Sequence, residues 1–201
     1  MFQVRIHGRG GQGVVTATEL LAQAAFDEGR HAQAFPSFGS ERTGAPVVAF
    51  ARIADTPIRV REPVMTPDAL IVQDETLLRA IDVFSGLSPT GFVVINSKLS
   101  FAELGLGDFA SPRDRLITVP ATEIAMEHLG RPVPNAVLLG AFAALTKIVT
   151  LQSVQDAISE RFSAKLAAGN SAAAGAAYQF VLEHLTDGAP ESRSEDVVAN
   201  V

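Results

Sequence analysis

The chain has 201 residues, a length that suits one α/β domain or a domain with a long appendage. Of these residues 47% are hydrophobic and 19% are charged, which indicates a globular and not a disordered chain. A net charge of −6 argues against nucleic acid as the main partner, because phosphate binding requires a clustered basic face. The sequence contains no cysteine, which excludes disulfides, thiol catalysis and iron–sulfur clusters held by its own thiolates.

The four histidines are scattered and lack the spacing of a metal-binding motif, so we assign no metal site. The amino terminus enters a strand pattern directly, without the charged region and apolar run of a signal peptide. No apolar stretch reaches membrane-spanning length without charges, glycine or proline. We therefore expect a cytoplasmic protein without a membrane segment.

The first predicted element is a strand that runs into a glycine-rich turn and then a helix. Apolar and polar residues alternate over residues 4–7, and an alanine- and leucine-rich helical pattern covers residues 14–28. Four glycines lie between them: Gly8, Gly10, Gly11 and Gly13. They contain the G-x-G-x-x-G spacing, and the start of the following helix can bind a phosphate or carboxylate. A purely structural turn, whose glycines serve only geometry and packing, fits the pattern equally well.

A dinucleotide site requires a second feature, an Asp or Glu at the end of the next strand that binds the ribose hydroxyls. That strand is predicted at residues 31–35, and the sequence Gln33-Ala34-Phe35-Pro36 at its end has no carboxylate. Self-sufficient NAD binding is therefore not expected. Two competing interpretations stay open: a free-standing NAD(P)-dependent dehydrogenase, and a nucleotide-sensing or assembly module without catalysis.

A loop rich in glycine, proline and serine follows at residues 36–46 and carries the pair Glu41-Arg42. Arg42 is suited to hold a carboxylate or a phosphate. A salt bridge at an interface is at least as good an interpretation of the pair.

A β-hairpin is predicted next, with strands at residues 47–53 and 58–61 and a turn between them. Arg52, Arg59 and Arg61 lie on this hairpin, and alternation would place Arg59 and Arg61 on the same face. Such a basic face would bind an acidic partner or an anionic cofactor tail, or it would simply be solvated.

Three apolar runs are typical of strands buried on both faces: residues 69–72, 92–96 and 116–119. Helical patterns cover residues 76–84, 121–129, 136–146, 153–162 and 164–184, with Asn135 as a predicted N-cap. We predict a doubly wound, Rossmann-like α/β fold with a mixed, mostly parallel sheet, a β-hairpin and a helical carboxyl-terminal third. The domain is placed at residues 1–185 and a polar, mobile tail at residues 186–201.

Three polar residues follow or end predicted strands, at the edge where open α/β sheets bind ligands: Asp74, Glu75 and Asn96. Helix capping or hydrogen bonding within a turn is the favoured alternative for each. His7 is interpreted as a packed, hydrogen-bonded histidine. No serine lies in a G-x-S-x-G elbow, and we assign no catalytic residue.

Two motifs, in the same order along the chain, make this sequence resemble a known family. Residues 7–17 read HGRGGQGVVTA and residues 33–47 read QAFPSFGSERTGAPV. Both are similar to the gamma subunit of the pyruvate:ferredoxin oxidoreductase family, whose members are 2-oxoacid oxidoreductases. The similarity extends to Asn135 and Leu139-Gly140, so that it spans most of residues 1–185.

The resemblance implies an enzyme that decarboxylates a 2-oxoacid on thiamine diphosphate, transfers the acyl group to coenzyme A and releases two electrons through iron–sulfur clusters. The complex would contain thiamine diphosphate, Mg²⁺ and iron–sulfur clusters, and this chain alone would hold none of them. Its partners would be alpha, beta and ferredoxin-like delta subunits, and in some enzymes a flavoprotein subunit that reduces NAD. Related gamma chains occur in enzymes for pyruvate, aryl and other 2-oxoacids, and residues 34–39 are closest to the pyruvate branch.

The family places this domain near the coenzyme A side of the active site. The resemblance therefore implies six residues that line or close that side: Gly8, Gly10, Gly11, Gly13, Glu41 and Arg42. We expect a scaffolding and active-site-closing subunit that is not catalytic alone.

Overall fold

The computed structural model describes residues 1–37, 43–107 and 112–187, and these residues form one six-stranded sheet. The strands are β1 (Phe2–Arg9), β2 (His31–Pro36), β3 (Pro46–Ala54), β4 (Ala69–Val72), β5 (Phe92–Asn96) and β6 (Leu116–Val119). Their order across the sheet is β2-β3-β1-β4-β5-β6. The predicted α/β fold with a mixed, mostly parallel sheet is confirmed.

The parallel half of the sheet consists of β1, β4, β5 and β6, which pair in that order. The apolar run of β4 is buried along its whole length, as expected for a parallel strand covered on both faces. The three strands predicted from apolar runs lie at the predicted residues. Because these strands are parallel, their carboxyl ends meet at one edge of the sheet, next to the glycine turn that follows β1.

The antiparallel part of the sheet is formed by β3, which pairs with β1 on one edge and with β2 on the other. The predicted β-hairpin therefore exists, but its strands are β2 and β3. The prediction that residues 58–61 form the second hairpin strand is wrong. Both edges of β3 are already paired, so these residues cannot pair with β3 as the predicted hairpin requires, and no helix or strand occurs between Asp55 and Asp68.

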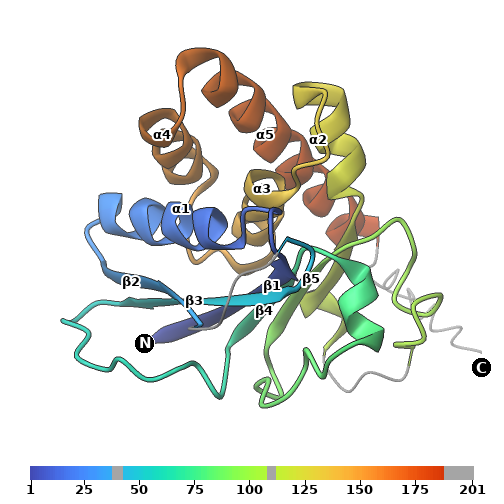
Figure 1. The fold of residues 1–201 in the computed structure, drawn as a ribbon, viewed down its shortest axis with the longest axis horizontal. Helices are drawn as coiled ribbons and strands as arrows, with labels where there is room; N and C mark the ends of the chain where they lie inside the picture. Colours follow the sequence, from blue (N-terminus) through green and yellow to red (C-terminus); the bar gives the residue numbers. More distant parts are fainter. Residues whose placement is uncertain (38–42, 108–111, 188–201) are drawn as a thin grey trace, which may run out of the picture.

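Within the residues that the structure describes, five helices pack on one face of the sheet, the upper side in Figure 1. They are α1 (Val14–Asp27), α2 (Ala121–Leu129), α3 (Asn135–Thr146), α4 (Leu151–Arg161) and α5 (Ala164–Asp187). α3 is buried from Asn135 to Leu145 and lies against the alanine-rich stretch of α5. A Cβ at Gly140 would lie 2.0 Å from the carbonyl oxygen of Ala174, so the two helix backbones are in direct contact.

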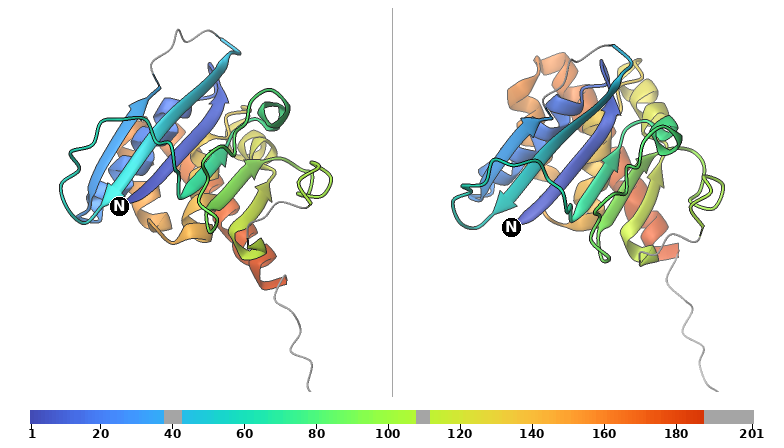
Figure 2. Two further views of the ribbon diagram at one scale, coloured as in Figure 1. Left: turned by 90° about the horizontal axis from the view of Figure 1, so that it is seen from below. Right: turned by 60° about the horizontal axis from the view of Figure 1, so that its bottom comes forward.

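The other face of the sheet, shown in Figure 2, is covered by short helical turns and irregular connections. η1 (Glu75–Arg79) replaces most of the helix predicted at residues 76–84, and η2 (Arg113–Arg115) precedes β6. Leu77 and Val83 form a second, smaller core with the outward side chains of β4 and β5. In the described part of the chain, no helix has the length and apolar character needed to cross a membrane.

Candidate functional site

The glycine turn connects β1 directly to α1. Gly8 still belongs to the strand, and a Cβ there would lie 2.5 Å from Cγ2 of Val14. Gly13 is the N-cap of α1 with a left-handed φ of 73°, and a Cβ there would lie 2.4 Å from Nδ2 of Asn135. Glycine is therefore required at Gly8 for close packing of helix on strand and at Gly13 for both conformation and space.

A hollow of about 290 Å³ lies at the amino terminus of α1. It is lined by Arg9, Gly10, Gly11, Gly13, Val14, Val15, Thr16 and Val47. The first N–H groups of a helix have no acceptor inside the helix, and they carry the positive end of its dipole. Because none of the described residues that line it is acidic, the hollow is suited to an anionic group.

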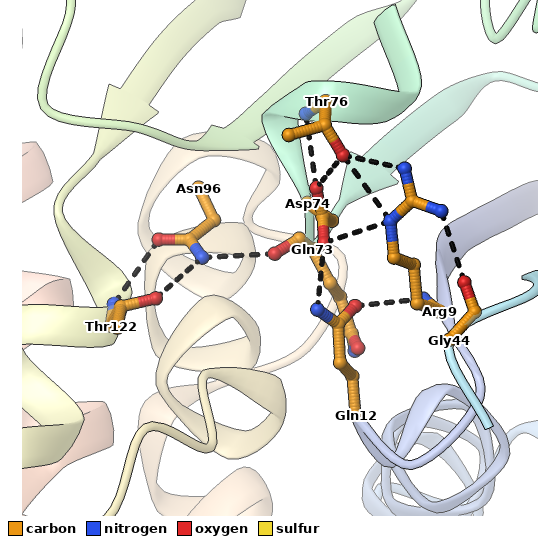
Figure 3. A network of polar contacts seen from close by, with 8 residues as sticks. All are labelled: Arg9, Gln12, Gly44, Gln73, Asp74, Thr76, Asn96 and Thr122. Atoms are coloured by element: carbon orange, nitrogen blue, oxygen red, sulfur yellow. Dashed lines mark hydrogen bonds and ion pairs between the residues drawn. The ribbon is translucent and has the colours of Figure 1, made fainter. Parts of the chain in front are cut away.

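Arg9, the last residue of β1, connects the turn to β4 and to the end of the following loop (Figure 3). Its Nε forms an ion pair with Oδ2 of Asp74 at 3.2 Å. Its Nη atoms donate to Oγ1 of Thr76 at 2.7 Å and to the carbonyl oxygen of Gly44 at 3.0 Å. Gln12 donates to Oδ2 of Asp74 at 2.9 Å and accepts from the backbone N–H of Arg9 at 2.7 Å. One polar network thus joins three segments that are distant in the sequence.

A larger crevice, of about 670 Å³, lies where the carboxyl ends of β4 and β5 face the amino termini of α2 and α3. Its lining includes Asp74, Glu75 and Asn96, so the sequence correctly placed these three residues at one edge. Gln73 also lines the crevice, and its buried side-chain amide has no hydrogen-bond partner among the described residues. Among the described residues of this lining are three carboxylates and one lysine, which makes the crevice less suited than the turn to a phosphate.

The capping alternative proposed from the sequence is confirmed for two of these residues. Oδ1 of Asp74 accepts from the backbone N–H of Thr76 at 3.0 Å and caps η1. Oδ1 of Asn96 accepts from the backbone N–H of Thr122 at 3.1 Å, in the first turn of α2. Nδ2 of Asn96 donates to the carbonyl oxygen of Gln73 at 2.9 Å and so holds β4 and β5 in register at the crevice.

Two titratable groups near the turn have perturbed pKa values. Burial raises the pKa of Asp74, but hydrogen bonds from Thr76 and Gln12 and the charge of Arg9 outweigh burial and hold this pKa below its usual range. Desolvation by burial, assisted by the charge of Arg5, lowers the pKa of His7 to about 4. The imidazole of His7 is therefore neutral at physiological pH.

His7 is buried, as predicted, with 4% of its surface exposed. The expected hydrogen bond is not found, since neither ring nitrogen has a partner within the described residues. Its side chain points to the sheet face opposite the helices, because it shares that face with Arg5 and Arg9 at every second position of β1. His7 is thus a packed residue of β1 and not part of the network around Asp74.

Glu41 and Arg42 lie outside the described residues, so their place near the site stays a prediction. The residues that follow them are described. Thr43 forms an isolated bridge with Gly10, whose backbone N–H donates to Ala45 at 2.9 Å and whose carbonyl oxygen accepts from Gly44 at 3.1 Å. The end of this loop therefore lies against the glycine turn.

The sequence did not single out Arg9, Gln12 or Thr76, nor the contact between Gly13 and Asn135. A signal existed for Thr76, because a residue two positions after an Asp is a common partner of that carboxylate. The link between Arg9 and Asp74 had no local signal, since 64 positions separate them and only the parallel pairing of β1 and β4 brings them together.

The described residues offer neither a metal site nor the second feature of a dinucleotide site. The described segments contain no group of three or more His, Asp or Glu residues arranged to hold a metal ion. β2 ends in Phe35 and Pro36, so the carboxylate that would bind an NAD ribose is absent from the end of this strand. The residues present do not fit a self-sufficient NAD site.

Comparison with known families gives the class of the protein. The model of the pyruvate ferredoxin/flavodoxin oxidoreductase family matches residues 3–180. Together with the α/β fold and the glycine turn, this match shows that the chain belongs to the pyruvate ferredoxin/flavodoxin oxidoreductase family.

Individual relatives identify the subunit. "Pyruvate synthase subunit PorC" of Methanothermobacter marburgensis is 49% identical over 179 residues, which cover 89% of this chain and 97% of the relative. The "Pyruvate/ketoisovalerate oxidoreductases common subunit gamma" of Pyrococcus furiosus is 47% identical over 179 residues, with 89% and 96% covered. The chain is thus a gamma subunit of a pyruvate/2-oxoacid ferredoxin oxidoreductase, and the resemblance found in the sequence is confirmed.

Solved structures show the same fold. The crystal structure of pyruvate oxidoreductase subunit PORC from Thermotoga maritima has a TM-score of 0.76 and 36% identity, and the match covers 89% of this chain and 95% of that one. The 2-oxoglutarate:ferredoxin oxidoreductase of Magnetococcus marinus matches with a TM-score of 0.66 and 18% identity, over 92% of this chain but 31% of that longer chain. The fold therefore occurs both as a separate subunit and within a larger polypeptide.

Proposed function

We propose that this gamma subunit is a scaffolding and active-site-closing component of an enzyme that uses thiamine diphosphate to convert a 2-oxoacid and coenzyme A into acyl-CoA. Alpha and beta subunits would hold thiamine diphosphate and Mg²⁺, and a ferredoxin-like delta subunit would hold the iron–sulfur clusters. Thiamine diphosphate would supply the carbanion chemistry of decarboxylation. The role of this chain would be to shape and close the active site.

The observation that carries this proposal is the absence of cysteine from a chain whose family reduces ferredoxin or flavodoxin. Iron–sulfur clusters in proteins are held mainly by cysteine thiolates, so electrons must leave through another subunit. A free-standing dehydrogenase is not favoured, because the end of β2 lacks the ribose-binding carboxylate.

The glycine turn is the proposed contribution of this chain to the coenzyme A side of the active site. Coenzyme A carries phosphates, and the hollow at the start of α1 offers backbone N–H groups with no carboxylate among the described residues that line it. We assign six residues to this side, as the resemblance implies: Gly8, Gly10, Gly11, Gly13, Glu41 and Arg42. The network around Arg9 would keep the turn and the end of the loop in fixed positions.

The substrate is proposed to be pyruvate or a related 2-oxoacid, including branched-chain or aryl acids. The Pyrococcus furiosus relative is named as a gamma subunit common to pyruvate and ketoisovalerate oxidoreductases. A subunit shared by two enzymes cannot by itself select between their substrates, so we assign substrate choice to the other subunits. Ferredoxin is the proposed electron acceptor, with transfer to NAD through an additional flavoprotein subunit as the second route.

Isolation of the native complex tests this proposal. An affinity tag on this chain is expected to recover a thiamine-containing subunit and an iron–sulfur subunit, and the complex should reduce ferredoxin when given a 2-oxoacid and coenzyme A. Recovery of the chain as a monomer that binds NAD or NADP would instead support a dehydrogenase. Assays with pyruvate, ketoisovalerate and an aryl 2-oxoacid, each with ferredoxin or NAD, would identify the substrate and acceptor.

A further inference from the structure

The connection between β3 and β4, residues 55–68, is a long irregular segment to which the proposed function assigns no role. It contains no helix or strand. Connections longer than roughly a dozen residues without secondary structure are uncommon in compact domains and are usually functional. Figure 2 shows this teal segment running across the sheet face that the helices leave uncovered.

A buried arginine fixes the middle of the segment. Arg52 of β3 is 1% exposed, and its guanidinium donates to the carbonyl oxygens of Val60, at 3.5 Å, and of Glu62. The guanidinium also donates to Oε1 of Gln3 at 3.2 Å and lies 5.1 Å from the ring centre of Phe35. Among the described residues, no carboxylate forms an ion pair with Arg52. A buried cation is costly unless its N–H groups are bonded, so these bonds hold the segment on a defined path.

The second half of the segment is anchored as well. Val64 is 1% exposed and packs inward. A Cβ at Gly86 would lie 2.0 Å from the carbonyl oxygen of Met65, so the two backbones are in close contact there. Nε2 of Gln3 donates to the carbonyl oxygen of Thr66 at 3.3 Å. The backbone of the segment is therefore held in place on both sides of its centre.

The exposed side chains of residues 58–65 are mainly apolar or cationic, with one exposed carboxylate, Glu62. Val60 is 42% exposed and Met65 is 72% exposed. Arg59 and Arg61 are also exposed and form no ion pair with any described residue. A groove of about 370 Å³ lies beside them and is lined in part by Met1. Arginine and methionine are enriched in protein interfaces, and a rigid backbone reduces the entropy lost on binding.

We propose that residues 58–65 and the groove beside Met1 form the surface by which this gamma subunit docks on an acidic surface of another subunit of its enzyme. Charge complementarity supports this partner, because residues 58–65 contain two arginines and one carboxylate, Glu62, and neither arginine forms an ion pair with a described residue of this chain, whose net charge is −6. A second copy of the chain is a poor partner, since a two-fold contact would bring these arginines against their own copies. The segment leads into the start of β4, at the edge of the sheet opposite the glycine turn, so docking leaves the candidate site free.

The test uses the complete complex, recovered through a tag on this chain from cells that produce all subunits. The variant Arg59→Glu/Arg61→Glu is compared with wild type and with Arg161→Glu/Lys165→Glu, which makes the same change of charge at exposed residues of α4 and α5. The first variant is expected to recover about tenfold less of the other subunits at roughly 0.15 M salt, and to lose them at a lower salt concentration. The control should behave like wild type.

A second variant tests the role of the fixed backbone. Arg52→Gln keeps both exposed arginines but removes the cation that holds the segment, so limited proteolysis should cut within residues 55–68 and recovery of the other subunits should fall. Thermal unfolding of each purified variant shows whether the domain itself is intact. Arg52→Gln with an intact domain, an uncut segment and wild-type recovery would contradict this role.

Three results would overturn the proposal. In the first, Arg59→Glu/Arg61→Glu recovers the other subunits as wild type does at every salt concentration. In the second, this variant loses a homodimer but no other subunit. In the third, it assembles normally and loses only coenzyme A use. The docking proposal rests on the proposed function as a subunit of a complex. If the wild-type chain recovers no other subunit, the proposed function fails; if only the docking surface is wrong, the wild-type chain still recovers them.

Discussion

The contact between α3 and α5 can be tested with two glycine-to-alanine substitutions of opposite expected sign. Gly140 lies in α3, where a Cβ would be 2.0 Å from the carbonyl oxygen and 2.6 Å from the carbonyl carbon of Ala174. Both atoms belong to the backbone, so the added methyl group cannot be accommodated by a side-chain rotation. Gly175 lies in α5, and the nearest atom to a Cβ there is Nε2 of Gln155, at an ordinary contact distance of 3.6 Å.

The magnitudes follow from these distances. Gly140→Ala forces the two helices apart, which costs about 3 kcal/mol at the upper end of ordinary overpacking, while the gain in helix propensity returns about 1 kcal/mol. The net loss of roughly 2 kcal/mol corresponds to a fall in melting temperature of about 4–8 °C for a domain of this size. Gly175→Ala gains helix propensity without a clash and should raise stability by about 0.5–1 kcal/mol.

Thermal and urea unfolding of the purified chain, followed by circular dichroism, measures both changes. A Gly140→Ala melting temperature equal to that of wild type would refute the proposed close approach of α3 and α5. A rise in the stability of both variants would show that helix propensity, and not packing, determines the result.

The remaining predictions concern the turn and β1. Gly13→Ala should lower the free energy of unfolding by about 1–3 kcal/mol, because the residue has a φ of 73° and its Cβ would overlap Asn135. Adding Asn135→Ala should recover the part of this loss that comes from the overlap, whereas losses of the two single variants that simply add in urea unfolding would contradict the contact. Gly10→Val should crowd the hollow at the start of α1 and either weaken assembly of the complex or raise the KM for coenzyme A. Normal assembly with normal turnover would contradict a role of the glycine turn at the coenzyme A side of the active site. His7 has a folded-state pKa of about 4, below its usual value of 6.5, so the stability that its neutral form contributes is complete above pH 6.5 and is lost as the pH falls toward 4. Relative to His7→Leu, the free energy of unfolding of wild type should be about 2 kcal/mol lower at pH 5 than at pH 7.5. Parallel pH profiles of the two proteins would contradict the burial of His7.

Most of the fold could be predicted from local patterns. The apolar runs of β4 and β5 and the breaks at Gly130 and Pro134 placed strands and helices close to their observed bounds. Residues 58–61 were misassigned because Ile58-Arg59-Val60-Arg61 alternates as a strand does, while the pairing that excludes a strand there is made by β1 and β2. Strand pairing is a long-range property, and the alternation of a short segment does not contain it.

The site could be predicted in part. The spacing of glycines identified the turn, and the position of Asp74 after an apolar run placed it at the ligand-binding edge of the sheet. The ion pair between Arg9 and Asp74 and the approach of Asn135 to Gly13 depend on how β1, β4 and α3 are arranged in space. The anchoring of residues 55–68 by Arg52 could not be predicted either, because no pattern in the sequence distinguishes a buried arginine from an exposed one.

The most direct test of this account is reconstitution of the enzyme from separately purified subunits, with and without this chain. Ferredoxin reduction that depends on a 2-oxoacid and coenzyme A is the measured activity. We expect no activity from the chain alone with any acceptor. The other subunits without this chain should be inactive or strongly impaired, and the combination of all subunits should be active. Oxidation of a metabolite by the isolated chain, or full activity of the other subunits in its absence, would contradict it.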